Sequence, residues 1–227
     1  EDGNRLTGQP FEATGWMKAK VPGTVLTTLL ENKLYPAPEF GLNNQLIPDI
    51  FHVGRAFYTY WFACPFTMEA LLPGQHAWLN FRGINYKAEI YLNGKRVNTV
   101  THEGMFLRQS YDITSYLKEN GTNVLAVLVF PPDHVGNPNG GQGGDGQIAR
   151  NCTMQYTPGW DWIQPVRDRN TGIWDEVSIA VTKDVRVQHP YVVTKVPGVR
   201  IPSASKQETA YLETSVELEN VSDQIQK

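Results

Sequence analysis

The sequence predicts an all-β fold, an antiparallel β-sandwich built from short strands. Short runs of aromatic and β-branched residues, each bounded by turn residues, recur along the chain. The 20 glycines and 15 prolines among 227 residues supply many turns. A hydrophobic fraction of 41% with 19% charged residues is ordinary for a globular protein, and the length allows a substantial core.

The predicted strands follow one another at short intervals. The clearest are residues 57–62, 77–81, 88–92 and 123–129, and weaker patterns cover residues 176–182, 185–188 and 209–218. The pair Asn93 and Gly94 predicts a type I′ hairpin turn, because both central positions of that turn need a positive φ.

One short helix is expected at residues 24–32, with Thr24 as its N-cap. Residues 110–117 resemble a strand end that runs into one helical turn. Two long loops, residues 34–54 and 131–157, lie between these elements, and loops of this length in a compact domain are usually functional or disordered.

The second loop carries a glycine-rich stretch, residues 140–146. A phosphate-binding loop is rejected, because no strand precedes the stretch, no helix follows it and no Gly-Lys-Ser or Gly-Lys-Thr is present. Glycines here let the backbone turn tightly or approach a ligand or a neighbouring domain closely.

The composition of the sequence changes after residue 181, where three prolines, at positions 190, 197 and 202, occur close together. We expect a first β-domain at residues 1–185, a linker at 186–208, and the truncated start of a second β-domain at 209–227. Residues 211–218 alternate like the first strand of a sandwich, yet the sequence offers them no partner strands. The chain is therefore expected to be a piece of a longer protein.

Charge and cysteine content exclude several classes of partner. A formal charge of -3 and a pI near 6.0, with scattered lysines and arginines, give no reason to bind nucleic acid. No apolar run is long enough to cross a membrane. Cys64 and Cys152 lack the spacing of a metal site, and either a disulfide between them or two unpaired buried thiols fits the sequence. Cysteine usage leaves the cellular compartment open.

Residues 159–175 hold three of the six tryptophans together with three aspartates and two arginines. Aromatic faces beside carboxylates and guanidinium groups suit a sugar, which offers an apolar C–H face and a rim of hydroxyls. The alternative is a structural corner whose indoles fill a core. That alternative is favoured for Trp174, whereas a sugar contact is favoured for Trp160 and Asp161.

A glycosidase needs two carboxyl groups on either side of the scissile bond. Asp161 with Asp168 or Asp175 is a candidate pair, but Arg167 and Arg169 are expected to depress these pKa values and so disfavour a general acid. Asp168 and Asp175 are therefore predicted to be ion-paired structural residues. All the histidines are predicted to be surface or turn residues: His52, His76, His102, His134 and His189.

Asp161 differs because it lies between two indoles. Its carboxylate can accept two sugar hydroxyls while Trp160 or Trp162 covers a ring face. Such a site binds a sugar but does not cleave it, so no catalytic residue and no metal or other cofactor is assigned to the chain.

Several stretches occur together in a recognisable order. They are Val-Pro-Gly-Thr-Val at 21–25, Tyr-Pro-Ala-Pro-Glu-Phe-Gly at 35–41, Asn-Phe-Arg-Gly-Ile-Asn-Tyr at 80–86, Glu-Ile-Tyr-Leu-Asn-Gly at 89–94, Gly-Met-Phe at 104–106, Gly-Gly-Gln-Gly-Gly-Asp at 140–145, Gly-Trp-Asp-Trp at 159–162 and Arg-Asp-Arg-Asn-Thr-Gly-Ile-Trp at 167–174. With them the chain resembles the N-terminal sugar-binding domain of glycoside hydrolase family two. It resembles the β-mannosidase and exo-glucosaminidase side of that family, and above all its mannosylglycoprotein endo-β-mannosidase group.

The resemblance implies a galactose-binding-like jelly-roll β-sandwich at residues 1–185. In the full enzyme an immunoglobulin-like sandwich follows, so residues 209–227 are expected to start that domain, and a TIM barrel then carries both catalytic glutamates. The resemblance also implies that Trp160 and Asp161 reach across the domain boundary and contact the sugar. Residues 163–165, Ile-Gln-Pro, replace the Gly-Pro pair of the exo-mannosidase pattern, which leaves the exact substrate open.

We therefore expect a non-catalytic domain of a glycosidase that acts on β-mannosides or related glycans, inactive by itself and without a cofactor. Its expected partners are carbohydrate and the remaining domains of the parent enzyme, and its expected location is secreted or periplasmic. The predicted substrate-binding residues are Trp160, Asp161 and Trp162, and the predicted loop-bracing residues are Arg167, Asp168, Arg169 and Trp174. The alternatives are an autonomous carbohydrate-binding or lectin-like module and a purely structural domain.

Overall fold

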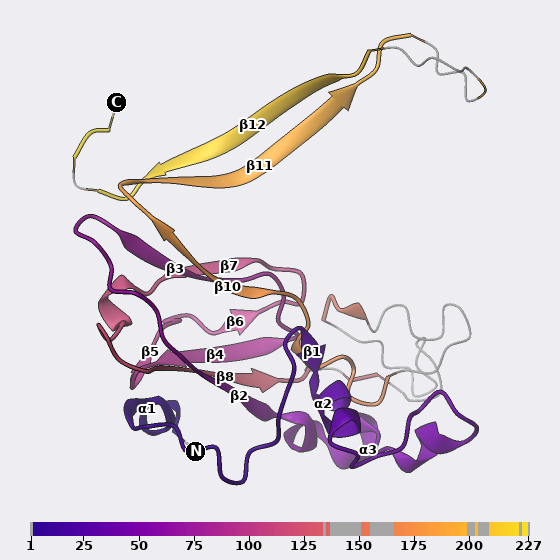
Figure 1. Ribbon diagram of the computed structural model, residues 1–227. Helices are drawn as coiled ribbons and strands as arrows, with labels where there is room; N and C mark the ends of the chain where they lie inside the picture. The colour runs from indigo at the N-terminus through magenta and orange to yellow at the C-terminus, as the bar shows by residue number, and fades with distance from the viewer. Residues whose placement is uncertain are drawn as a thin grey trace. The chain divides into compact units, whose positions relative to one another are not determined.

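The computed structural model describes residues 2–133, 135–136, 151–154, 166–198, 203, 209–222 and 224–226 (Figure 1). The chain divides into two compact units, which are described separately. The larger unit comprises Glu1–Leu71 and Ala77–Ala180, and the smaller comprises Leu72–His76 and Val181–Lys227. Among the described residues, no helix is both long and apolar enough to span a membrane.

The larger unit is built around two β-sheets. The first has five strands: β2 (Tyr60–Phe66), β8 (Asn123–Phe130), β4 (Lys87–Leu92) and β5 (Lys95–Arg96) in that order, with β6 (His102–Glu103) also paired to β4. The second has three strands in the order β10 (Val177–Thr182), β3 (His76–Phe81) and β7 (Gln109–Asp112). All pairs of the larger sheet, and β3 with β7, are antiparallel. The predicted all-β antiparallel class is therefore confirmed.

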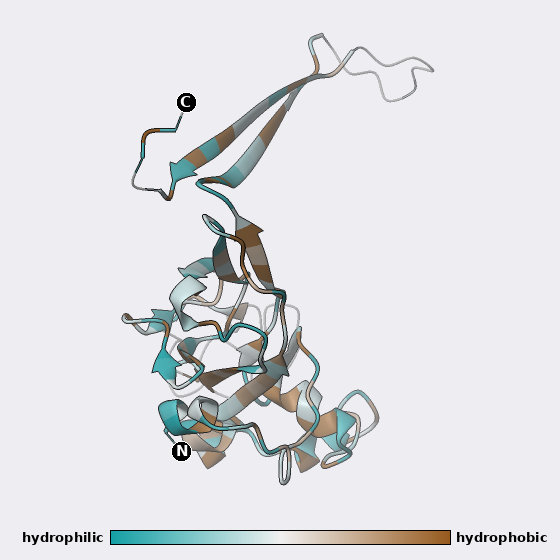
Figure 2. Cartoon of the chain, turned by 60° about the vertical axis from the view of Figure 1, so that its left-hand side comes forward, coloured by the Kyte–Doolittle hydropathy of each residue, from teal (hydrophilic) through white to brown (hydrophobic). Residues whose placement is uncertain are grey.

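The core lies between these two sheets. Ala88, Ile90 and Leu92 of β4 share one buried cluster with Leu79 and Phe81 of β3. Every second residue of a strand points to the same face, so this alternation turns the apolar side of each sheet inward. Figure 2 shows the apolar residues concentrated on the strands of this unit.

The hairpin between β4 and β5 has the predicted type I′ turn. Asn93 has φ 50° and Gly94 has φ 83°, and Leu92 pairs with Lys95 across the turn. A helix that the sequence did not indicate, α1 (Gly3–Gly8), contacts this turn, because the Gly94 N–H donates to Thr7 Oγ1 at 2.8 Å. Gly3 of this helix also lies against the ring of Tyr91, whose side chain is on the face of β4 opposite the core residues Ile90 and Leu92.

The predicted helix is present as α2 (Val25–Glu31). Thr24 caps it, since Thr24 Oγ1 accepts from Thr27 N at 3.2 Å and Thr27 Oγ1 accepts from Thr24 N at 2.8 Å. Residue Thr24 also belongs to β1 (Gly23–Thr24), which pairs with β9 (Gly172–Ile173). The predicted helical turn after β7 is present as the 3-10 helix η3 (Thr114–Tyr116).

The first long loop contains more structure than predicted. It holds the 3-10 helix η1 (Asn43–Leu46) and the short helix α3 (Ile50–Val53). Strand β2 begins at Tyr60 rather than at residue 57, because residues Arg55–Tyr58 form the 3-10 helix η2. There Tyr58 is buried, and its hydroxyl donates to the Pro48 carbonyl. This hydrogen bond between residues 58 and 48 favours the 3-10 helix η2 over the strand that the local sequence pattern predicts.

The smaller unit contains a long antiparallel pair, β11 (Val185–Lys195) and β12 (Tyr211–Asn220). Two expectations are corrected here: residues 186–195 of the expected linker are strand, and residues 211–218 do have a partner. Pro190 lies within the register shift between Gln188 and Tyr191, where a missing N–H is tolerated. Polar and apolar residues alternate through most of β12, whereas Tyr191, Val192 and Val193 of β11 are consecutive apolar residues. The domain boundaries and the immunoglobulin-like assignment stay predictions.

Two further expectations change. Cys64 and Cys152 are both free and exposed, so they form neither a disulfide nor a pair of buried thiols. His102 is buried rather than on the surface, and burial lowers the pKa of its imidazole. It lies in β6, where it pairs with Ala88 of β4. His52 and His189 are exposed, whereas His134 lies outside the described residues.

Candidate functional site

The three predicted sugar-contact residues, Trp160, Asp161 and Trp162, belong to residues 155–165, which lie outside the described residues. The glycine-rich stretch, residues 140–146, lies outside them as well. The structure does describe the segment that follows directly, from Val166 to Trp174. The site is therefore built from that segment, which carries all four predicted bracing residues.

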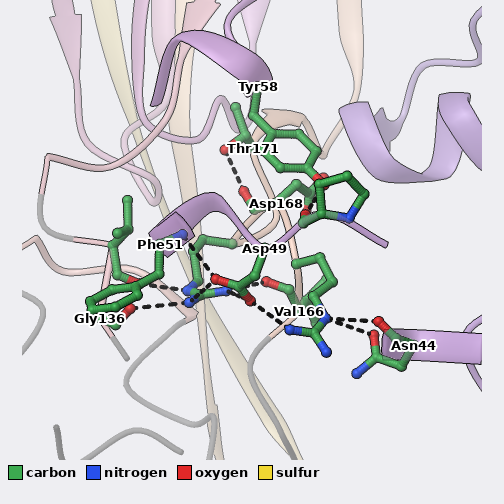
Figure 3. A network of polar contacts seen from close by, with 12 residues as sticks. Asn44, Asp49, Phe51, Tyr58, Gly136, Val166, Asp168 and Thr171 are labelled. Carbon is green, nitrogen blue, oxygen red and sulfur yellow. Dashed lines mark hydrogen bonds and ion pairs between the residues drawn. The ribbon is translucent and has the colours of Figure 1, made fainter. Parts of the chain in front are cut away.

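Arg169 is the centre of a buried polar network (Figure 3). Its side chain is 1% exposed, and its two Nη atoms pair with the two carboxylate oxygens of Asp49 at 3.0 and 3.1 Å. Its remaining N–H groups donate to the carbonyls of Val135, Val166 and Gly136. A bidentate guanidinium–carboxylate pair with every N–H satisfied offsets the cost of burying both charges.

Arg167 extends the network to a second element. Its Nη1 lies 3.2 Å from Asp49 Oδ2, and its Nε donates to the Asn44 carbonyl at 3.0 Å. The Arg167 carbonyl in turn accepts from Ile50 N at 3.0 Å. Figure 3 shows Asp49 between Asn44 on one side and Gly136 on the other. One carboxylate at the start of α3 thus joins both arginines to the first long loop.

Asp168 has a different environment from the one predicted. It is fully buried, and its Oδ2 accepts from Leu26 N at 2.7 Å while its Oδ1 accepts from Asn170 N at 2.8 Å. Burial raises the pKa of this carboxyl, and the backbone N–H donors oppose that shift only in part. The expected ion pair and lowered pKa are wrong, because Arg167 and Arg169 turn to Asp49 and leave Asp168 to cap α2.

Asn85 fixes the turn that follows the arginines. Its Nδ2 donates to the carbonyls of Arg169 at 2.8 Å and Asn170 at 2.9 Å. Those two residues have φ of 52° and 58°, and Gly172 follows with φ 153°. A Cβ on Gly172 would lie 2.6 Å from the Gly23 carbonyl oxygen, so only glycine fits there.

Trp174, the last residue of the segment, packs against the β-sandwich. Its Nε1 donates to the Met105 carbonyl at 3.0 Å, and its ring meets Phe106 edge to face at 5.9 Å. A Cβ on Gly83 would lie 2.4 Å from the indole, so the ring rests directly on that glycine. Asp175 is separate from the network and half-buried, and its Oδ2 lies 3.7 Å from Arg82 Nε. The ion pair predicted for Asp175 is therefore present, but its partner is Arg82 rather than Arg167 or Arg169.

Sequence reasoning missed the acceptor on which the network depends. Asp49 lies about 120 positions before Arg169, and no local pattern links the two. The available signal was weak: Asp49 precedes the apolar residues Ile50 and Phe51, and it caps α3 by accepting from Phe51 N at 2.9 Å. Among the described residues, no group of three or more His, Cys, Asp or Glu side chains is placed to hold a metal ion.

Comparison with known proteins gives the family. The family model described as glycosyl hydrolase 2 galactose-binding domain-like matches residues 4–175. A mannosylglycoprotein endo-β-mannosidase from Lilium longiflorum is 50% identical over 209 residues, which are 91% of this chain and 21% of that protein. An exo-β-D-glucosaminidase from Streptomyces avermitilis is 29% identical over 94% of this chain and 20% of that protein.

Solved structures agree on the fold. An exo-chitosanase from Amycolatopsis orientalis matches with a TM-score of 0.72 at 24% identity, over 97% of this chain and 22% of that one. A β-D-mannosidase from Dictyoglomus thermophilum matches with a TM-score of 0.64 at 25% identity, over 92% of this chain and 30% of that one. The chain spans about a fifth of the length of the curated relatives that it matches. The resemblance inferred from the sequence motifs is confirmed, and the chain belongs to the glycosyl hydrolase 2 galactose-binding domain-like family.

Proposed function

We propose that this chain is the non-catalytic N-terminal sugar-binding domain of a family-two glycoside hydrolase that acts on β-mannosides or related glycans. In this proposal Trp160 and Asp161, with Trp162 beside them, contribute sugar contacts to an active-site pocket that other domains of the parent enzyme complete. The proposal includes a secreted or periplasmic location, which fractionation of the native cells tests.

The observation that carries the proposal is the buried polar network of Arg167, Arg169 and Asp49, which we call the anchor and whose arginines follow Trp160 and Asp161 closely in the sequence. Arg169 has every N–H bonded and pairs with Asp49 in bidentate fashion. A loop that only connects two strands does not need a buried ion-pair network at its end, whereas a loop that must place side chains accurately does. We therefore assign a bracing role to Arg167, Asp168 and Arg169, and Trp174 continues it into the sandwich.

The carboxylates near the anchor support a non-catalytic role. Asp49 is committed to two arginines and to the α3 cap. Asp168 is committed to the backbone at the start of α2. A general acid needs a free path to the leaving-group oxygen, and neither group has one. The names of the relatives point to β-linked hexoses, and the catalytic carboxylates are proposed to lie in the remainder of the parent enzyme.

Replacing sugar contacts in the full-length parent enzyme tests the proposal. Removing the Asp161 carboxylate leaves sugar hydroxyls unpaired, which costs on the order of 1 to 3 kcal/mol, or about 5- to 150-fold in kcat/KM. Asp161→Ala is compared with Glu119→Ala, a change at an exposed carboxylate outside the segment. Loss of kcat/KM on β-mannosides or β-glucosaminides with Asp161→Ala alone supports the proposal.

Calorimetry with the isolated chain separates the alternatives. Mannose, glucosamine and N-glycan fragments are titrated into residues 1–227, and the proposal predicts no tight binding. Saturable binding in the micromolar range or below would instead assign an autonomous carbohydrate-binding module. Unchanged turnover with Asp161→Ala would assign a purely structural domain.

A further inference from the structure

The larger unit has an apolar groove of about 840 Å³ on the flank of its sandwich. Core side chains Leu79, Phe81 and Val127 form its floor, and residues of the segment 11–22, including Phe11 and Trp16, also line it. Among the described residues, one sheet of the unit has three strands and the other has five, and residues of both sheets line the groove.

Two strand edges border the groove. Consecutive residues line it on each flank: 61–64 of β2 on one side, and Glu176 with 177–179 of β10 on the other. Side chains of a strand alternate between its faces, so a run of consecutive lining residues means that the edge of the strand faces the groove. Among the described residues, β2 and β10 are the outermost strands of their sheets. The groove therefore combines an apolar floor with unpaired backbone edges.

We propose that this groove receives one further β-strand, supplied by a part of the same polypeptide outside residues 1–227, and that this strand pairs with β10. An extended strand suits the groove because it satisfies an unpaired edge and turns alternate side chains to the apolar floor. The inference rests on the groove and on the length of the relatives, and it is independent of the proposed sugar contacts.

The sequences of β2 and β10 indicate which of the two strands pairs with the added strand. Strand β2 contains Pro65, which has no N–H to donate and is typical of an edge that remains unpaired. Strand β10 reads Val-Ser-Ile-Ala-Val-Thr, without proline and rich in β-branched residues. Its six residues match an added strand of about 20 Å.

The source of the strand follows from the size of the relatives. The chain spans about a fifth of the curated proteins that it matches, so most of such a polypeptide lies outside these residues. A strand in the same polypeptide acts at high effective concentration, which a free peptide lacks. The occupant is therefore an extended, proline-free segment with apolar side chains at alternate positions.

The two free cysteines provide a reporter and its internal control. Cys64 is exposed and lines the groove, whereas Cys152 is exposed and does not line it. An occupant of the groove shields Cys64 from a thiol reagent and leaves Cys152 unaffected. Modification of the two cysteines gives two kinetic phases, and the Cys64→Ser and Cys152→Ser variants show which cysteine produces each phase.

The test attaches a strand to residues 1–227. A strand of about seven alternating valines and threonines is fused at the N-terminus through a Gly/Ser linker of about 18 residues, which reaches roughly 24 Å. The matched control carries proline at the centre of the added strand. We expect the fusion to slow modification of Cys64 by about tenfold or more, to protect the β10 amides from hydrogen exchange, and to leave Cys152 unchanged.

Three outcomes would overturn the inference. Equal protection of Cys64 by the proline control would show that any tethered segment shields it, and no protection in either fusion would show that the groove takes no strand. Protection of Cys64 that grows with concentration in the unfused chain would assign a second copy as the occupant.

Discussion

The anchor around Arg169 and the groove between β2 and β10 lie in the same unit and differ in completeness. At the anchor every charged N–H of Arg169 has an acceptor within the chain. At the groove an apolar floor and two strand edges have no partner among the described residues. The polar network around Arg169 is thus complete within the described residues, whereas the groove is the place where we propose that a further strand from outside residues 1–227 is added.

The largest expected effect lies at the anchor. Asp49→Ala leaves two arginines without their carboxylate, and removing one partner of a buried pair costs about 3 to 5 kcal/mol in the free energy of unfolding. The matched control is Asp133→Ala, whose side chain is 63% exposed beside Arg55. Its loss is expected to be about 0 to 1 kcal/mol. Denaturant unfolding of the chain measures both losses. Equal losses in the two variants would contradict the expected difference between the buried and the exposed ion pair.

An intermediate effect separates the sealed core from the groove. Val129 is fully buried in the core cluster and does not line the groove, whereas Val177 is half-buried at the groove edge. Val129→Ala is expected to cost about 2 kcal/mol through lost burial and the cavity left behind, and Val177→Ala less than about 1 kcal/mol. Because the chemical change is the same at both sites, the difference between the two losses reports how tightly each side chain is packed. A larger loss at Val177 would mean that the groove is already closed in solution.

The smallest expected effect is a pH dependence. Burial lowers the pKa of His102 below its ordinary 6.5, so the unfolded chain binds this proton more readily than the folded one. The contribution is fully present above pH 6.5 and is lost as the pH falls through that value toward the folded pKa. The free energy of unfolding should therefore fall as the pH is lowered from 7 to 5.

The His102→Gln variant provides the comparison for this slope. Its side chain does not titrate, so its unfolding free energy should change less over the same pH range. Parallel pH profiles for the two proteins would show that His102 is not the group responsible.

Local signals explain what the sequence predicted well. The hairpin at Asn93 and Gly94 depends on two adjacent residues, the α2 cap depends on Thr24 and Thr27, and β3, β4 and β8 carry their apolar residues in short runs. The family motifs added the galactose-binding-like fold, which the comparisons confirm.

Long-range contacts explain what the sequence could not predict. The acceptor for Arg167 and Arg169 is Asp49, far away in the chain, so the nearer Asp168 was wrongly chosen as their partner. Strand β2 starts late because Tyr58 bonds to Pro48. Strand β11 is exposed along most of its length, so burial imposes no clear alternation to reveal where it ends.

The central claim is that the anchor positions Asp161 for the sugar, and a double-mutant cycle in the full-length parent enzyme tests it most directly. Arg167→Ala removes contacts to Asn44 and Asp49, and it should lower kcat/KM by about tenfold through misplacement of the loop. In an Asp161→Ala background the same change should have less than about a twofold effect, because the contact it positions is already gone. Equal losses of kcat/KM in both backgrounds would contradict the account.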